Sequence, residues 1–147
     1  MIKIISFVDS FKHYSDPIKE FQKRLWKEIE IIKLKPIKNW NIIEKETDFL
    51  IKYLEKEDWY KIVLNPNGKN FSTEKFYELI EEKKTNYKNI IFIIGWANWI
   101  NYKRIKNLID FELNFWKMIM PHILILLVLI EQLYRISMIK KGTSYHK

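Results

Sequence analysis

A nearly uninterrupted apolar stretch close to the C-terminus constrains the fold more than any other part of the chain. Residues 123–130 (ILILLVLI) contain no polar side chain, and Glu131, Gln132, Tyr134 and Arg135 then bring polar groups back at helical spacing. A helix that is apolar on every face must be covered on every face. The stretch therefore predicts one long buried helix, packed against its own domain and against something else.

The ends of this stretch fit a helix of a soluble protein. Pro121 suits the first turn, where its missing N–H costs no hydrogen bond, and Gly142 suits the position just past the end. The additional cover could be a membrane or a second copy of the chain. A bilayer requires about 20 consecutive apolar residues, and the run here is much shorter. We therefore expect a core helix that also forms a dimer interface, with no membrane partner.

Composition and charge favour a folded protein with a polyanionic partner. The chain has 147 residues, of which 48% are hydrophobic, and a net charge of +8. It has no cysteine and three histidines without metal-ligand spacing, so we expect neither a disulfide framework nor a metal. The N-terminus lacks the long apolar region of a signal peptide, which indicates a cytoplasmic protein. RNA is the natural polyanion, although a lysine-rich composition alone is weak evidence for it.

Short apolar runs alternate with helical patterns along the rest of the chain. Strands are expected at 2–8, 28–34, 60–64, 89–94 and 111–113, and helices at 17–26, 41–56, 102–108, after Ser72 or Thr73 and after Pro121. Residues 65–68 (NPNG) are typical of a turn. The alternation predicts a single α/β domain, residues 1–147, with a mostly parallel sheet flanked by helices. Because ligands bind beyond the carboxyl ends of such strands, the site should lie among the loops after Leu64, after Ile94 and before Pro121.

The C-terminal segment also carries a resemblance to a known family. Its Pro-His pair, apolar run, Glu-Gln-Leu-Tyr-Arg sequence at 131–135 and final Tyr-His-Lys are similar to those of the RlmH family, bacterial ribosomal RNA large subunit methyltransferases of the SPOUT class. The resemblance runs the full length of the chain. It implies a SPOUT α/β fold in which a C-terminal trefoil knot cradles S-adenosylmethionine. It also implies a homodimer that methylates N3 of a pseudouridine in 23S ribosomal RNA of the assembled ribosome.

The resemblance places cofactor contacts in the three loops already singled out. Leu64 would lie against the cofactor, and Gly95 matches the family's first loop glycine. The segment before Pro121 would wrap the methionine and adenine parts of the cofactor, mainly through backbone groups; its residues are Phe115, Trp116, Lys117, Met118, Ile119 and Met120. Without the resemblance, Leu64 reads as an ordinary core leucine, and Met118 and Met120 fit a core stretch equally well.

Four positions depart from the family pattern, and one of them is Leu126, which stands where family members often have an arginine. Trp96 and Trp99 stand where the family has glycines, and Asn65 stands where it usually has an acidic residue. The two indoles could fill the adenosine pocket, stack on the adenine ring or merely pack. If they close the pocket, the alternative function is a catalytically silent protein that binds RNA or the ribosome on the same fold.

The tryptophan content suggests a further hypothesis for this loop. The chain has six tryptophans and three glycines, whereas glycine usually makes up about 7% of residues. Some bacteria read the UGA codon as glycine and others read it as tryptophan. If this gene uses the first code but was translated with the second, Trp96 and Trp99 are natively glycines. UGG codons at both positions would exclude the hypothesis.

The catalytic candidates lie in the C-terminal segment. His146 is the expected base that removes the proton from N3, and Arg135 or Tyr145 would stabilise the negative charge that develops on the base oxygens. Arg135 follows Glu131 by four residues, so the alternative to a catalytic role for Arg135 is an intrahelical ion pair with Glu131. Tyr145 and His146 belong to a polar tail that could also be a solvated chain end. In the implied homodimer, the partner's tail is expected to complete each site.

Overall fold

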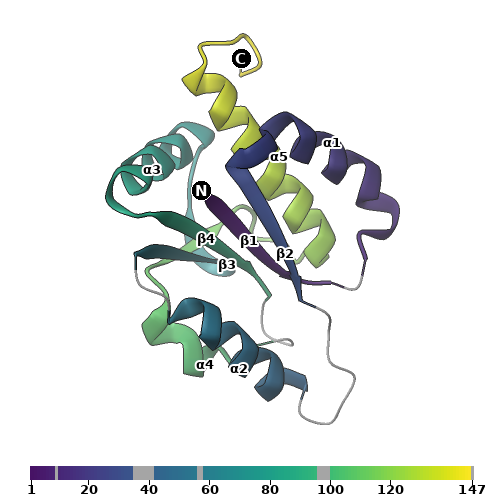
Figure 1. The fold of residues 1–147 in the computed structure, drawn as a ribbon, viewed down its shortest axis with the longest axis vertical. Helices are drawn as coiled ribbons and strands as arrows, with labels where there is room; N and C mark the ends of the chain where they lie inside the picture. The colour runs from purple at the N-terminus through teal and green to yellow at the C-terminus, as the bar shows by residue number, and fades with distance from the viewer. Residues whose placement is uncertain (9, 35–41, 56–57, 96–99, 147) are drawn as a thin grey trace.

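The chain folds into a five-stranded sheet between two layers of helices (Figure 1). In the computed structural model, the described residues are 1–8, 10–34, 42–55, 58–95 and 100–146. The elements in chain order are β1 (Ile2–Phe7), α1 (Ser15–Leu25), β2 (Ile29–Leu34), α2 (Ile42–Leu54), β3 (Trp59–Asn70), α3 (Thr73–Asn86), β4 (Asn89–Ile94), α4 (Tyr102–Ile105), β5 (Phe111–Asn114) and α5 (His122–Lys140). The strand order is β2-β1-β4-β3-β5, and each of these neighbouring pairs is parallel. The predicted α/β class with a parallel sheet is confirmed.

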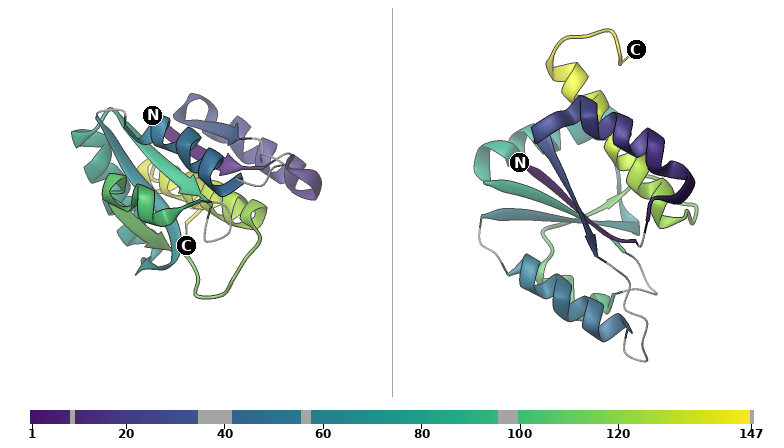
Figure 2. Two further views of the ribbon diagram at one scale, coloured as in Figure 1. Left: turned by 90° about the horizontal axis from the view of Figure 1, so that it is seen from below. Right: turned by 45° about the vertical axis from the view of Figure 1, so that its right-hand side comes forward.

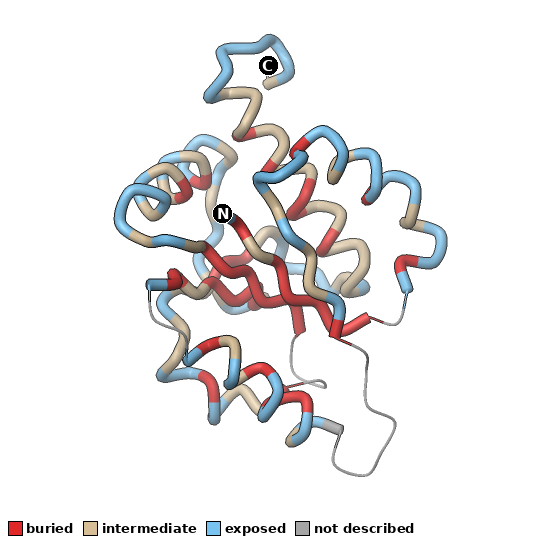
Figure 3. Tube along the Cα trace, viewed as in Figure 1, coloured by how far each residue is buried: buried red, intermediate tan, exposed pale blue. Residues whose placement is uncertain are grey.

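Each face of the sheet supports its own hydrophobic layer. On one face, strand residues such as Ile4 and Phe92 pack against α1, α3 and α5. On the other, Ile5 and Phe7 pack with residues of α2 and α4. The alternation along β1 follows from the strand geometry, in which successive side chains point to opposite faces. The sheet is accordingly the most buried part of the molecule, while the outer surfaces of the helices are exposed (Figure 3).

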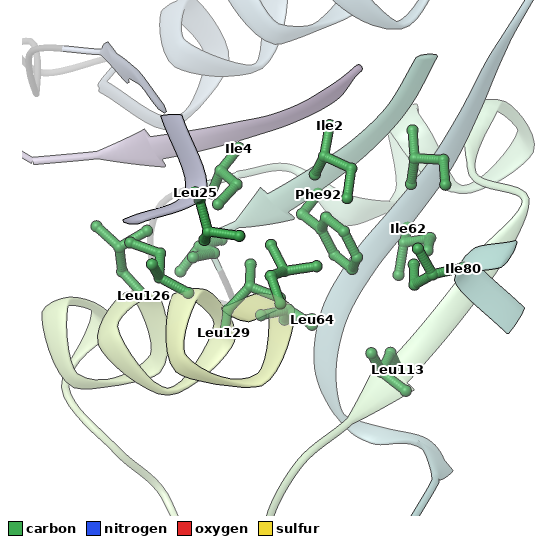
Figure 4. Close-up of a cluster of buried hydrophobic side chains, with 14 of the residues drawn as sticks. Ile2, Ile4, Leu25, Ile62, Leu64, Ile80, Phe92, Leu113, Leu126 and Leu129 are labelled. Atoms are coloured by element: carbon green, nitrogen blue, oxygen red, sulfur yellow. The ribbon is translucent and has the colours of Figure 1, made fainter. Parts of the chain in front are cut away.

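The C-terminal apolar stretch forms the central helix of the larger layer. Leu126 and Leu129 of α5 point toward the sheet near Ile4 and Leu25 (Figure 4), and α5 contacts α1, α3 and β4. Its fully buried side chains are Leu126, Leu129, Ile130, Leu133 and Ile136. Each such side chain stabilises the fold by about 1.5–3 kcal/mol. By length and composition alone α5 could also cross a membrane, but its packing confirms the predicted core helix.

The two residues predicted to mark the ends of α5 lie next to those ends, Pro121 before the helix and Gly142 after it. Pro121 is the residue immediately before the first helical position, with φ −58° and ψ 143°. Gly142 has φ 66°, a left-handed conformation that a residue without Cβ adopts at little cost. Its N–H donates to the Ile139 carbonyl at 2.9 Å, and the Thr143 N–H donates to the Met138 carbonyl at 3.0 Å. This pair of bonds ends the helix and turns the tail back on itself.

The predicted turn at residues 65–68 is wrong, because these residues lie within β3. Leu64 and Lys69 both pair with Leu113, so the residues between them form an irregularity in the β3–β5 ladder. A Cβ on Gly68 would lie 2.7 Å from the backbone carbon and oxygen of Glu112. The glycine therefore permits a close approach of two strands, which the turn signal in the sequence does not distinguish from a reversal of the chain.

Other boundaries follow local capping chemistry. Ser72 is the predicted cap of α3, and its Oγ accepts a hydrogen bond from the Lys75 N–H at 3.3 Å. The predicted helix at 102–108 is confirmed as α4 followed by a single 3-10 turn, Lys106–Leu108. These signals are short-range, which explains why the sequence reveals them.

Trp26 adopts a backbone conformation that is unfavourable for a residue with a side chain. Its φ is 37° and its ψ is −141°, and its side chain is 70% exposed. Trp59, by contrast, is only 7% exposed, and the Lys3 ammonium lies 4.8 Å from its ring centre. Trp26 thus shows glycine-like geometry with little burial, which extends the codon hypothesis to this position. Trp96 and Trp99 lie outside the described residues.

Replacing Trp26 with glycine is expected to stabilise the protein. Relief of the positive φ should raise the free energy of unfolding by about 1 kcal/mol. Urea denaturation monitored by circular dichroism measures the change. The neighbouring Lys27→Gly is the control, because Lys27 is exposed and has no positive φ; it should lower stability slightly or leave it unchanged. A lower stability of Trp26→Gly would contradict this account of the residue.

Candidate functional site

A cavity of about 360 Å³ opens at the carboxyl edge of β3, β4 and β5. Three segments that are distant in the sequence surround it, together with the first turn of α5. The segment from β5 to α5 loops out beyond the sheet (Figure 2). The lining residues are Leu64, Asn65, Pro66, Ile94, Gly95, Leu113, Asn114, Phe115, Trp116, Met118, Ile119, Met120, His122 and Ile125. The cavity therefore lies where the parallel sheet predicts a ligand site.

The structure brings most of the predicted cofactor residues together. Leu64, Gly95 and the segment Phe115–Met120 all border the cavity, with the exception of Lys117. Lys117 is exposed, and its side chain is not part of the lining. The binding role of these residues stays a prediction, but their convergence from three separate segments is what a shared ligand requires.

The size and lining of the cavity are typical of a small-molecule site. Small-molecule sites usually enclose about 300–1,000 Å³ and combine apolar walls with a few polar groups. The walls here are mainly aliphatic, and Asn65, Asn114 and His122 add the polar groups. Ile119 is 94% exposed, so a bound ligand or a partner chain would bury apolar surface at this loop.

Two buried amides hold the irregular part of β3 beside the cavity. The Asn65 Oδ1 accepts from the Asn67 N–H at 2.8 Å, and its Nδ2 donates to Glu112 Oε2 at 2.5 Å. The Asn114 Nδ2 donates to the Pro66 carbonyl at 2.9 Å, and its Oδ1 accepts from the Trp116 N–H at 2.8 Å. Sequence reasoning named Asn65 only as a departure from the family pattern in the loop after Leu64, and it missed Asn114. Their positions at the carboxyl ends of neighbouring strands were the available signal.

Helix α2 anchors the far end of the loop that follows β4. The Asn101 N–H donates to Thr47 Oγ1 at 2.8 Å, and its side chain donates to Glu44 Oε1 at 2.8 Å. Arg104 pairs with Glu44 and Asp48, each at 2.6 Å. Hydrogen bonds from Asn101 and then Arg104 hold the pKa of the Glu44 carboxyl below its ordinary value. These contacts tie Asn101 and Arg104 to α2.

His122 places a titratable group at the cavity. It is the first residue of α5 and lines the cavity. Burial lowers the pKa of the imidazole below its ordinary value, because the charged form loses hydration in an apolar setting. The histidine is therefore held neutral near pH 7.

The predicted catalytic residues lie in the second half of α5 and in the tail that follows it. Arg135 Nη2 pairs with Glu131 Oε1 at 2.6 Å, which confirms the intrahelical ion pair. The Arg135 guanidinium also lies 5.0 Å from the centre of the Tyr145 ring, and the Tyr145 hydroxyl donates to Glu131 Oε1 at 3.3 Å. His146 Nε2 lies 2.9 Å from Glu74 Oε1 on α3. The tail therefore packs on its own chain.

A single chain does not join this tail to the cavity. Arg135 follows His122 by thirteen positions on one helix, which corresponds to about 20 Å at 1.5 Å per residue. Tyr145 contacts Glu131, Tyr134 and Arg135, in the middle part of α5. The predicted cofactor residues thus lie around the first turn of α5, and the predicted catalytic residues form a second cluster with its middle part.

The fold and the cavity define an α/β protein with a cavity of small-molecule size at the carboxyl edge of a parallel sheet. A family described as "Predicted SPOUT methyltransferase" matches residues 1–146. The chain is 38% identical to "Ribosomal RNA large subunit methyltransferase H" of Caldicellulosiruptor bescii over 156 aligned positions, which cover 100% of both chains. Proteins of the same name from Fusobacterium nucleatum subsp. nucleatum and Streptococcus gordonii are 38% and 36% identical over 143 and 149 residues, and 92% of each chain is covered.

The chain therefore belongs to the SPOUT methyltransferase family. The resemblance to ribosomal RNA large subunit methyltransferases, inferred from the C-terminal motif, is confirmed by these relatives.

The burial of His122 predicts how stability changes with pH. Because its pKa is lowered from 6.5 in the folded state, the unfolded chain binds the proton more readily between the folded value and about 6.5. The contribution of neutral His122 is complete above that window and is lost as the pH falls through it. Thermal denaturation from pH 7.5 to 5.5 should show a decline that is shallower in His122→Gln. Parallel curves for the two proteins would contradict the assignment.

Proposed function

We propose that this protein is an S-adenosylmethionine-dependent methyltransferase that acts on N3 of a pseudouridine in 23S ribosomal RNA of the large subunit. The observation that carries the proposal is the cavity at β3, β4 and β5, which lies in a chain of the SPOUT methyltransferase family. The names of the relatives support large-subunit ribosomal RNA as the substrate. A net charge of +8 suits such a polyanion. An enzyme that modifies ribosomes would work in the cytoplasm.

The cavity residues would bind and orient the cofactor. The aliphatic wall formed by Leu64, Ile94 and Met120 would cover the adenine ring, and backbone groups of residues 115–120 would follow the methionine part. S-adenosylmethionine supplies a methyl group already activated on its sulfonium. The protein then mainly holds the acceptor nitrogen in line with that methyl group.

The catalytic roles belong to the tail. An imide nitrogen such as N3 must lose its proton to act as a nucleophile, and His146 would accept that proton. Arg135 or Tyr145 would stabilise the charge that develops on the neighbouring oxygens of the base. Because the cavity of one chain lies at the first turn of α5 and the tail packs against the middle of the helix, at Glu131 and Arg135, the partner subunit's tail would complete each site in a homodimer.

The outer side of α5 supports the homodimer. Leu124 and Val128 are four residues apart, so they share one side of the helix. Both are only half-buried, and neither belongs to the hydrophobic layer under the sheet. A second copy of the chain would give this apolar side the cover that an all-apolar helix requires. The trefoil knot and the extent of the methyltransferase domain over residues 1–147 stay predictions of the same resemblance.

Methyl transfer to ribosomes tests the proposal. Purified protein with S-adenosylmethionine labelled in its methyl group should label large subunits that lack the modification, and mass spectrometry should locate the methyl group on a pseudouridine. His146→Ala should reduce the rate by at least about 100-fold, because general bases typically contribute that much. His13→Ala is the matched control, since His13 is exposed in the turn Lys12–Tyr14, and it should leave the rate unchanged.

The outcomes separate the two functions considered for this fold. Labelling that His146→Ala leaves intact would remove the base assignment but keep the methyltransferase. If the chain transfers no methyl group, Trp96→Gly combined with Trp99→Gly decides between a misread loop and a silent protein. Activity only in the double variant identifies the misread loop. Inactivity of both, with retained ribosome binding, identifies the catalytically silent alternative.

The dimer is tested separately by sedimentation. Val128→Glu combined with Leu124→Glu places two charges on the half-buried side of α5 and should convert a two-chain species into a folded monomer. Leu126→Glu is the contrasting variant, because Leu126 is fully buried under the sheet and its replacement should unfold the chain. Analytical ultracentrifugation and circular dichroism report the two effects. A double variant that remains a dimer would exclude this side of α5 as the interface.

A further inference from the structure

Glu112 contacts the segments that surround the cavity, although its own side chain is not part of the lining. It lies in β5, two residues before Asn114. Its Oε2 accepts a hydrogen bond from Asn65 Nδ2 at 2.5 Å, and its Oε1 accepts one from the Tyr102 hydroxyl. Asn65 belongs to the irregular part of β3, whereas Tyr102 is the first residue of α4 and follows the loop after β4. One carboxylate therefore links β3, β5 and the exit of the β4 loop.

The carboxylate also determines which way the Asn65 amide faces. An ionised carboxylate only accepts hydrogen bonds, so it must receive the amide nitrogen of Asn65 and not the amide oxygen. That orientation turns Asn65 Oδ1 toward the Asn67 N–H, from which it accepts at 2.8 Å. Asn65 is only 4% exposed, so a wrong orientation would leave a buried polar group without its partner.

We propose that Glu112 is a positioning residue for cofactor binding, acting through Asn65 and Tyr102 on the walls of the cavity. The inference rests on the proposed function for the identity of the ligand. The geometry of the walls themselves follows from the hydrogen bonds of the protein alone. Glu112 touches neither the cavity nor a reacting atom, so it acts by holding Leu64, Asn65 and the adjoining loop in place.

Asp110 provides a matched control one position before β5. Its Oδ2 accepts a hydrogen bond from the Lys61 N–H at 2.7 Å, so it too is a carboxylate that joins the β5 side to β3. Neither Asp110 nor Lys61 lines the cavity. Loss of Asp110 should weaken the fold without altering the cavity walls, which separates a general structural effect from positioning.

The first experiment compares Glu112→Ala with Asp110→Ala. Calorimetric titration with S-adenosylhomocysteine should show about tenfold weaker binding for Glu112→Ala, because the buried Asn65 donor loses its acceptor. Asp110→Ala should bind within about twofold of the unaltered protein. In the ligand-free proteins, the Asn67 amide should exchange its hydrogen faster in Glu112→Ala than in the unaltered chain or in Asp110→Ala.

The second experiment exchanges the amide and the carboxylate between the two strands. Asn65→Asp alone sets two carboxylates against each other and should weaken binding more than Glu112→Ala does. Adding Glu112→Gln restores complementarity, since the glutamine amide can donate to Asp while its oxygen accepts from Tyr102. The double variant should therefore recover most of the affinity. This rescue keeps the test decisive if Glu112→Ala fails to fold.

The outcomes distinguish the inference from the function on which it rests. If the unaltered chain binds S-adenosylhomocysteine and Glu112→Ala binds it equally well, the positioning role is overturned and the proposed function stands. If the exchanged pair binds no better than Asn65→Asp, the role is likewise overturned. If the unaltered chain does not bind, the proposed cofactor is wrong. Hydrogen exchange at the Asn67 amide then tests the role of Glu112 without a ligand. Equal exchange rates in all the proteins would overturn that role.

Discussion

The need to cover α5 determines much of this molecule. Leu126, Leu129 and Ile130 are fully buried beneath the sheet, and α1 and α3 flank the helix. Its outer side remains apolar and half-buried, at Leu124 and Val128. The cavity lies at the first turn of the same helix, and the tail packs against its middle part, at Glu131, Tyr134 and Arg135. The helix that completes the core thus also spaces the two clusters of predicted site residues.

The cavity depends on polar contacts that interrupt regular β structure. Residues 65–68 leave the register of the β3–β5 ladder, and their backbone groups need other partners. Asn65 and Asn114 supply these partners from neighbouring strands, and Glu112 fixes the amide of Asn65. The irregularity therefore shapes the cavity at the edge of the sheet.

The sequence predicted those features that depend on local chemistry or on strong periodicity. The apolar run of α5, the cap at Ser72 and the glycine at Gly142 are short-range signals, and all three are confirmed. The predicted turn at 65–68 was wrong because Gly68 permits a close approach to the backbone of Glu112, which is distant in the chain. The contacts of Asn65 and Asn114 were invisible for the same reason. The tail residues were recognised from the family resemblance, but the distance between them and the cavity became apparent only from the position of the tail along α5 in the structure.

The most direct test of the account is the structure of the protein with S-adenosylhomocysteine bound. The account predicts a homodimer in which the cofactor occupies the cavity between Leu64, Gly95 and residues 115–120, with the partner subunit's Tyr145 and His146 facing its sulfur. That result would join the two clusters that one chain holds apart. A cofactor bound elsewhere, or a cavity completed without any residue of a second chain, would contradict it.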